Sequence, residues 1–161
     1  MPFLSRSDIE IYYERRGEGP PLLLFNGSGA SVESSALLID RLALHFEVLV
    51  HDQRGLGRTS VPHSASAVTM GHYAADAAAL LDHVGWTSCR VFGISFGGMV
   101  ALEFAVTHPA RVERLALVAT SPGGEGGSSY PLHLLAEMPP QERAFVSLRN
   151  LDTRFTPSWL S

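Results

Sequence analysis

Residues 93–97, Gly-Ile-Ser-Phe-Gly, combine a serine with glycines two positions to either side of it. A β-prone run, residues 89–92, precedes this segment and an apolar helical stretch follows it. In such a strand–turn–helix setting, a G-x-S-x-G pattern indicates a nucleophilic serine. Its hydroxyl could attack a carbonyl carbon while amide N–H groups at the helix start stabilise the oxyanion. The spacing therefore predicts Ser95 as a nucleophile and the backbone N–H of Phe96 as an oxyanion donor. The alternative is a chance match to the pattern, which the flanking strand and helix disfavour.

The flanking glycines have a predicted steric role. A serine on so sharp a turn has a strained backbone, and a Cβ at position 93 or 97 would collide with the turn or hold the helix away from the strand. Gly98 extends the run of small residues. We therefore expect close packing between this helix and the sheet.

A second glycine-rich segment, residues 26–31, follows the apolar run at 21–25. One interpretation is a phosphate-binding loop, but the G-K-[ST] ending and the G-x-G-x-x-G spacing are both absent. The other is the second half of an oxyanion hole, with the N–H of Ser28 facing the reacting carbonyl. We favour the oxyanion hole. Residues predicted to contact the substrate are Asn26, Gly27, Gly29 and Met99, and those predicted to tune acyl specificity are Ser31, Val32 and Met99.

Strands and helices must alternate to position these two segments. Continuous apolar runs are typical of strands buried on both faces of a parallel sheet, and four are present, at residues 21–25, 47–50, 89–92 and 114–119. Residues 9–14 alternate between apolar and polar, which predicts an outer antiparallel strand. The fold class predicted is α/β, with a mostly parallel sheet and helices on both faces.

Two helices are predicted before the serine. Residues 34–45 carry leucines at near-helical spacing (Leu37, Leu38, Leu42 and Leu44), with Ser34 or Ser35 as the N-cap. Residues 73–84 are rich in alanine and point Leu80 and Leu81 inward, and Gly85 ends the helix.

Asp52 and Arg54 follow the second apolar strand, where catalytic groups are often found. One hypothesis is that they take part in chemistry. We favour the other, in which Asp52 accepts backbone N–H bonds, Arg54 pairs with a nearby side chain, and both brace the loop.

Composition limits the class of protein. The 161 residues are 45% hydrophobic with a net charge of −4 and mixed signs, which fits a globular domain and disfavours nucleic acid as a partner. Cys89 lies in an apolar strand and is expected to be a buried hydrophobe. No secretion signal or membrane-length apolar run is evident, so we expect a cytoplasmic protein without a membrane partner.

The character of the chain changes after Thr120. Residues 121–129 are rich in glycine and serine, and two short helices are expected at 132–138 and 141–148, divided by Pro139 and Pro140. The predicted organisation is a core at residues 1–120 and the start of a helical lid at residues 121–161.

The chain resembles the large lid-bearing α/β-hydrolase family that includes enol-lactonases, carboxylesterases, carbon–carbon bond hydrolases and cofactor-free haloperoxidases. The motifs that carry the resemblance lie at residues 26–29, 52–57, 93–98 and 108–115. The resemblance implies that Ser95 is the nucleophile and that the amides of Phe96 and Ser28 form the oxyanion hole. It also implies a small ester, lactone or related carbonyl substrate and no cofactor or metal. Asn26 stands where the family more often has histidine.

The family places an acid and then a histidine after the serine, on loops that follow later strands. Here the later histidines are His108, predicted to cap the helix after Ser95, and His133 in the predicted lid. The remaining histidines are expected at the surface or at helix ends: His45, His51, His63, His72 and His83. We therefore expect the amino-terminal portion of a hydrolase, truncated within the lid and weak or inactive alone.

Two other hypotheses stay open. In one, the chain is a non-catalytic binding or signalling module on a hydrolase scaffold. In the other, a second chain completes it. An apolar edge at residues 115–119 is also expected to promote self-association.

Overall fold

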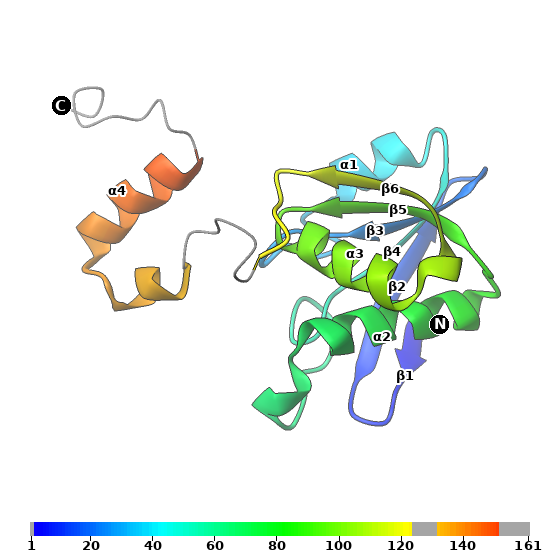
Figure 1. Cartoon of the computed structure of the whole chain (residues 1–161), viewed down its shortest axis with the longest axis horizontal. Helices are drawn as coiled ribbons and strands as arrows, with labels where there is room; N and C mark the ends of the chain where they lie inside the picture. The colour runs from blue at the N-terminus through cyan, green and yellow to red at the C-terminus, as the bar shows by residue number, and fades with distance from the viewer. Residues whose placement is uncertain (1, 124–131, 152–161) are drawn as a thin grey trace. The chain divides into compact units, whose positions relative to one another are not determined.

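The structure is a computed structural model that describes residues 2–123 and 132–151. The chain forms two compact units, Met1–Pro122 and Gly123–Ser161. Six strands form one sheet in the first unit (Figure 1): β1 (Phe3–Ser5), β2 (Glu10–Arg16), β3 (Pro21–Phe25), β4 (Glu47–His51), β5 (Cys89–Ile94) and β6 (Val112–Val118). Their order across the sheet is β1-β2-β4-β3-β5-β6. The strands from β4 to β6 run parallel, and β1 and β2 are antiparallel.

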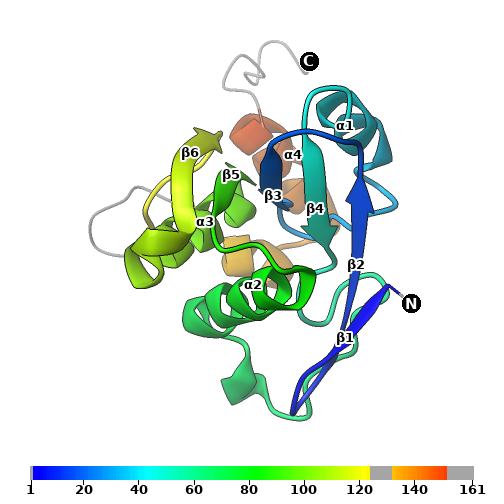
Figure 2. The ribbon, with the colours of Figure 1, turned by 90° about the vertical axis from the view of Figure 1, so that its right-hand side faces the viewer.

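The helices of the first unit are α1 (Ala36–Leu42), α2 (Met70–Val84) and α3 (Phe96–Thr107), with 3-10 turns η1 (Ala65–Ala67) and η2 (Pro109–Arg111). Alternate residues of β3 face opposite sides of the sheet. Leu23 and Phe25 belong to the core cluster that includes α2 and α3, whereas Leu24 packs in the cluster that includes Ile39 of α1. Figure 2 shows α1 on the face opposite α2 and α3. The predicted mostly parallel sheet with helices on both faces is confirmed.

The two helices that precede Ser95 differ from the prediction at their ends. α2 begins at Met70 instead of residue 73, because the Thr69 side chain accepts a hydrogen bond from the His72 N–H and caps the helix. It ends as predicted, with Gly85 in the left-handed region at φ 77°.

α1 is shorter than the predicted segment 34–45. Ser35 occupies the N-cap position without a side-chain capping bond. The leucines whose spacing predicted this helix divide between surface and core: Leu37 and Leu44 are 76% and 67% exposed, whereas Leu38 and Leu42 pack against the core. Ile39 is the fully buried residue of this helix.

The sheet continues one strand further than predicted at its antiparallel edge. β2 is antiparallel, as residues 9–14 indicated, but it is not outermost because β1 pairs with it through the Phe3–Tyr12 and Leu4–Ile11 positions. β1 has three residues, which is too short for a detectable alternation.

β6 is the fourth predicted apolar strand, and it forms the exposed edge expected at residues 115–119 instead of a strand buried on both faces. Within the described residues it pairs with β5 alone, and six of its seven residues are exposed. The apolar residues Leu115, Leu117 and Val118 are 37%, 38% and 46% exposed. An apolar run therefore marked a strand here, but it did not mark burial, because burial depends on what covers the strand.

The second unit contains η4 (Leu132–Glu137) and α4 (Pro140–Leu151). These correspond to the two predicted helices, with Pro140 at the first position of α4, where the missing N–H has no helical acceptor to lose. Most of the predicted linker and the His133 side chain lie outside the described residues. No helix in the described ranges is both long and apolar enough to cross a bilayer.

Candidate active site

Ser95 lies between the last residue of β5 and the first residue of α3. Its backbone has φ 52° and ψ −122°, and Ala119 is the other non-glycine residue with positive φ among the described residues. Four hydrogen bonds hold its backbone. Its N–H donates to the Val118 carbonyl at 2.9 Å, and its carbonyl accepts from Thr120 Oγ1 at 2.7 Å, the Gly98 N–H at 2.9 Å and the Met99 N–H at 3.4 Å. The side chain is exposed. The sheet thus fixes a strained serine whose hydroxyl is accessible.

The glycines around Ser95 allow close packing. A Cβ on Gly93 would lie 2.7 Å from the Gly97 carbonyl oxygen and from the Gly98 Cα. A Cβ on Gly97 would overlap the carbonyl oxygens of Phe25 and Asn26. None of these glycines has positive φ, so the strain resides in the serine and the glycines give the helix room to approach the sheet.

The glycine-rich loop after β3 lies against this turn. A Cβ on Gly27 would lie 3.6 Å from both the Ser95 Cβ and the Ile94 carbonyl oxygen. The Ala30 N–H donates to the Gly27 carbonyl at 3.2 Å and closes a tight turn, in which Gly29 has φ 69°. β3 and β5 are parallel neighbours, so their carboxyl ends bring the loop and Ser95 together at the edge where α/β sheets bind ligands.

The other predicted site residues differ in exposure. Ser28 and Gly29 are exposed, and Met99 is half-buried in the first turn of α3. Phe96 is the first helical residue, and its N–H has no acceptor within the helix. Asn26 is only 2% exposed, so protein covers its side chain. The predicted specificity role of Val32 is wrong, because its side chain is 1% exposed and packs in the core with Ile39.

Asp52 braces the loops, as favoured from the sequence. Its carboxylate accepts the Val32 N–H at 2.6 Å and the Arg58 N–H at 2.8 Å. Its carbonyl accepts the Thr59 hydroxyl at 2.7 Å. One side chain therefore joins the loop after β3 to the loop after β4.

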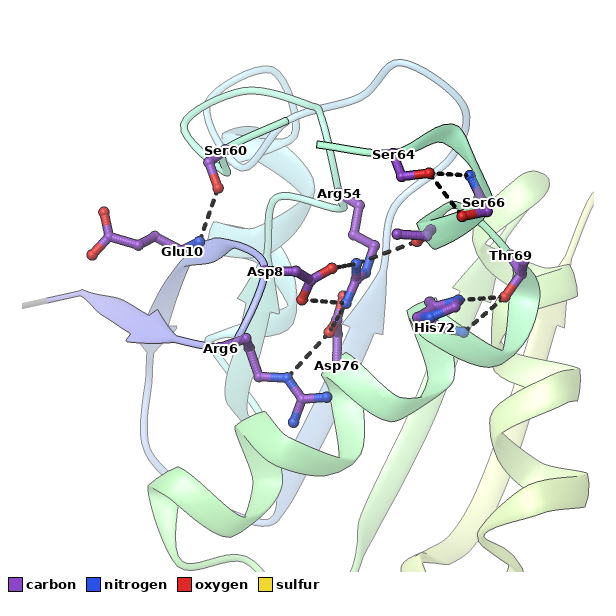
Figure 3. Close-up of polar contacts among 11 residues, drawn as sticks. Arg6, Asp8, Glu10, Arg54, Ser60, Ser64, Ser66, Thr69, His72 and Asp76 are labelled. Atoms are coloured by element: carbon purple, nitrogen blue, oxygen red, sulfur yellow. Dashed lines mark hydrogen bonds and ion pairs between the residues drawn. The ribbon is translucent and has the colours of Figure 1, made fainter. Parts of the chain in front are cut away.

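Arg54 forms a buried ionic cluster with Asp76 of α2 and Asp8 (Figure 3). Its Nε lies 2.5 Å from one Asp76 oxygen and its Nη2 lies 2.8 Å from the other. Arg54 was predicted to pair locally, but its partners are distant in the sequence, since Asp76 and Asp8 are 22 and 46 residues away. Burial alone would lower the Arg54 pKa, but the hydrogen bonds to Asp76 and Asp8 outweigh it and raise the pKa above the ordinary value.

His51 and His108 have structural surroundings. His51 is 2% exposed, so its predicted surface position is wrong, and burial lowers its pKa from 6.5 to about 4. It is the last residue of β4, and its ring meets Phe25 edge-on. His108 follows α3, its N–H donates to the Phe104 carbonyl, and its ring stacks on Phe104, which confirms the predicted capping role. Within residues 2–122 of the first unit, no imidazole or carboxylate is hydrogen-bonded to the Ser95 hydroxyl.

Three polar residues near these loops were not singled out from the sequence. Thr120 holds the Ser95 carbonyl, and Gln53 Nε2 donates to the Asn26 carbonyl at 2.8 Å. Asp76 had a detectable signal, since it precedes the inward-facing Leu80 by four residues and so shares its helix face. Thr120 and Gln53 lie in loops, where no periodicity marks an inward side chain.

A cleft of about 370 Å³ lies elsewhere in the first unit. Its walls include Tyr12, Glu14 and Arg58, and Ser95 is not among its lining residues. The Arg58 guanidinium stacks over the Tyr12 ring at 4.6 Å, and Glu14 is paired with Arg16. Four of its lining residues thus pair with one another, and of the predicted specificity residues Ser31 also lines it. The candidate active site is at Ser95.

Comparison with known proteins shows the family of this chain. The profile of the alpha/beta hydrolase fold family matches residues 20–154. A non-heme haloperoxidase of Rhodococcus erythropolis is 35% identical over 126 residues, which cover 76% of this chain and 45% of that enzyme. A pimeloyl-[acyl-carrier protein] methyl ester esterase of Vibrio vulnificus is 34% identical over 113 residues, which cover 70% of this chain and 42% of the esterase.

The solved structures include a hydrolase from Pseudomonas aeruginosa PA01 that superposes with a TM-score of 0.72 at 31% identity. The superposition covers 89% of this chain and 52% of the hydrolase. The chain thus spans about half the length of these relatives.

Proposed function

We propose that this chain, which belongs to the alpha/beta hydrolase fold family, carries the nucleophile and the oxyanion hole of a serine hydrolase that acts on small carbonyl compounds. The observation that carries the proposal is the conformation of Ser95, a non-glycine residue at φ 52° with an exposed side chain at a strand–helix junction. Such strain persists only where surrounding contacts enforce it, and it is concentrated at functional sites.

In the proposed reaction, Ser95 Oγ bonds to the substrate carbonyl carbon and its proton passes to a general base. No described residue is assigned as that base. The carbonyl oxygen becomes an oxyanion, which the N–H groups of Phe96 and Ser28 stabilise. The tetrahedral intermediate then expels the alcohol as the base returns the proton, and water hydrolyses the resulting acyl-enzyme.

The two amide donors would contribute much of the rate. Loss of one oxyanion donor typically lowers kcat by about 10²–10³-fold. Phe96 supplies its N–H from the first position of α3, where the helix dipole also favours negative charge. Ser28 is exposed in the loop that lies against Ser95. Both donors are backbone groups, so the fold and not the side-chain type would determine their direction.

Esters and lactones are the substrates we propose first. The methyl ester esterase of V. vulnificus supports this class by its name. Gly27 and Gly29 would approach the substrate through their backbone and Met99 through its side chain. Asn26, predicted to contact the substrate, is 2% exposed and would instead support the loop. We propose that residues 121–161 begin a lid and that the protein acts in the cytoplasm. We also propose that this chain alone has weak activity or none, because a serine hydroxyl without a general base is a weak nucleophile.

Reaction with a fluorophosphonate tests the proposal directly. Labelling needs one reaction per serine and no turnover, so we expect the purified chain to form, slowly, a covalent adduct that mass spectrometry locates on Ser95, and we expect Ser95→Ala to abolish it. Ser66→Ala is the matched control, because Ser66 is also an exposed serine and its loss should leave labelling unchanged. A folded chain that is never labelled at Ser95 would contradict the proposal. A ligand bound equally well by Ser95→Ala, without turnover, would instead support a non-catalytic binding module.

A further inference from the structure

We infer that Gln53 is a positioning residue for the oxyanion hole, because its side-chain amide holds the Asn26 carbonyl and thereby orients the backbone that leads to the Ser28 N–H. This inference rests on the proposed function. Gln53 lies in the loop after β4 and Asn26 directly follows β3, so the hydrogen bond joins two loops at neighbouring carboxyl ends of the sheet.

The Gln53 side chain is fixed by burial and by its hydrogen bond. It is 1% exposed, and its Nε2 donates to the Asn26 carbonyl at 2.8 Å. Rotation of the amide by 180° would place Oε1 against that carbonyl, and two acceptors would then face each other. The orientation with the N–H donated to Asn26 is therefore the stable one.

The Asn26 carbonyl is held from two sides. A Cβ on Gly97 would overlap this oxygen, so the start of α3 packs directly against it. The Gln53 amide supplies its hydrogen-bond donor. A buried carbonyl that loses its donor is costly, so the backbone would turn toward another partner if Gln53 could not donate.

The held carbonyl controls the direction of the next residues. The Asn26 C=O and the Gly27 N–H belong to one planar peptide unit, so fixing the oxygen fixes the plane from which Gly27 continues. Gly27 lies against Ser95, and the bond between the Ala30 N–H and the Gly27 carbonyl closes the turn that contains Ser28. The Ser28 N–H thus takes its direction from a segment anchored at both ends.

The surroundings of Gln53 point to this single role. Among the described residues, the buried Gln53 Oε1 and the buried Asn26 Nδ2 have no hydrogen-bond partner. Buried polar atoms are ordinarily paired, and an exception calls for a specific explanation. The Nε2 bond to the Asn26 carbonyl accounts for an amide side chain at this position despite its unpaired Oε1. An apolar residue of the same size would fill the space without holding the loop.

Gln53→Met distinguishes a side chain that only fills the space from one that also holds the Asn26 carbonyl, because methionine has similar length and no amide. Thr59→Val is the matched control. Thr59 is buried in the same loop, and its hydroxyl makes two hydrogen bonds, to the Asp52 carbonyl and from the Tyr12 N–H, neither of which involves Asn26. Both variants are compared in the full chain.

The first readout is the ¹⁵N chemical shift of two amides. The Gly27 amide responds to hydrogen bonding at the preceding Asn26 carbonyl, and the Ser28 amide responds to any rotation of the backbone that follows that carbonyl. The second is the fluorophosphonate reaction at Ser95. We expect Gln53→Met to shift both amides and to lower the maximal labelling rate by about tenfold or more, with an unchanged half-saturating concentration. Thr59→Val should do neither.

The outcomes separate this inference from the proposed function. If the unmodified chain is never labelled, the proposed function fails, and with it the catalytic purpose of Gln53. If it is labelled and a folded Gln53→Met leaves the rate and both amide shifts unchanged, the inference alone is overturned. Should Gln53→Met fail to fold, Gln53→Glu replaces it. We then expect shifted amides at neutral pH and recovery when acid protonates the carboxyl, which can again donate; no recovery would overturn the inference.

Discussion

Different residues around Ser95 have different structural roles. Ser95 has the unfavourable backbone conformation, Thr120 and Val118 hold its carbonyl and N–H, and the neighbouring glycines keep space for the helix. The conformation is imposed by hydrogen bonds from β6 and the residues after it, and by contact with the end of β3. It would relax if either contact moved.

Gly97→Ala tests that requirement. The new Cβ would overlap the carbonyl oxygens of Phe25 and Asn26, so we expect a loss of about 1–3 kcal/mol in the free energy of unfolding and slower labelling of Ser95. Gly71→Ala in α2 is the control, because a Cβ at that position would have Thr69 Oγ1, at 3.9 Å, as its nearest contact. Alanine there should stabilise the helix by up to about 1 kcal/mol. Equal stability of the two variants in urea titrations would refute the steric role of Gly97.

His51 predicts a dependence of stability on pH. Its pKa is about 4 in the folded chain and near 6.5 when unfolded. Between these values the unfolded chain binds a proton that the folded chain does not, so the free energy of unfolding falls as pH falls from 6.5 to 4, by about 3 kcal/mol in total. Above pH 6.5 both forms are neutral and this contribution is constant.

Urea titrations of His51→Asn and the unmodified chain at several pH values would isolate that contribution. We expect the variant to lose less stability than the unmodified chain between pH 6.5 and pH 4. His63→Gln, at an exposed position, should keep the full pH dependence. Parallel stability curves for His51→Asn and the unmodified chain would show that His51 does not titrate as its burial requires.

At the scale of elements, the loop after β4 connects much of the first unit. Asp52 ties it to the loop after β3, Gln53 holds the end of β3, and Arg54 joins α2 and the amino-terminal segment. Three consecutive buried side chains thus contact three separate elements. The position of the glycine-rich loop beside Ser95 depends on this connection.

Arg54→Met tests the ionic part of it. The Arg54 and Asp76 side chains are 1% and 3% exposed, so removal of the cation leaves a buried carboxylate without its main partner. We expect a loss of about 3–5 kcal/mol in the free energy of unfolding. The double variant Arg54→Met/Asp76→Asn should recover part of it, since the uncompensated charge is gone. A double variant that is as unstable as the sum of both single variants would argue against a coupled pair.

At the scale of the whole molecule, the sheet has an exposed apolar strand. β6 pairs with β5 alone among the described residues, and its leucines are more than a third exposed. Unpaired edges with apolar side chains are templates for pairing with another chain. The self-association expected from the sequence therefore stays a prediction, now attached to a defined strand.

Leu117→Lys tests the edge. A charge on an exposed edge strand opposes pairing, so we expect light scattering to give a mass near that of one 17.4 kDa chain at concentrations where the unmodified chain is heavier. Leu37→Lys is the control, because Leu37 is 76% exposed but lies on α1. A monomer in the unmodified chain at high concentration would contradict the prediction, as would equal effects of the two variants.

The sequence by itself determined the local order of the chain. The glycine spacing around Ser95, the apolar runs of β3, β4 and β5, and the Gly85 helix end are set by backbone sterics and by side-chain periodicity, which act between near neighbours. Tertiary structure alone decided that Arg54 pairs with Asp76 and Asp8, that Gln53 holds Asn26 and that His51 is buried. These outcomes depend on contacts between segments far apart in the chain, and periodicity within one segment carries no information about which partner covers it.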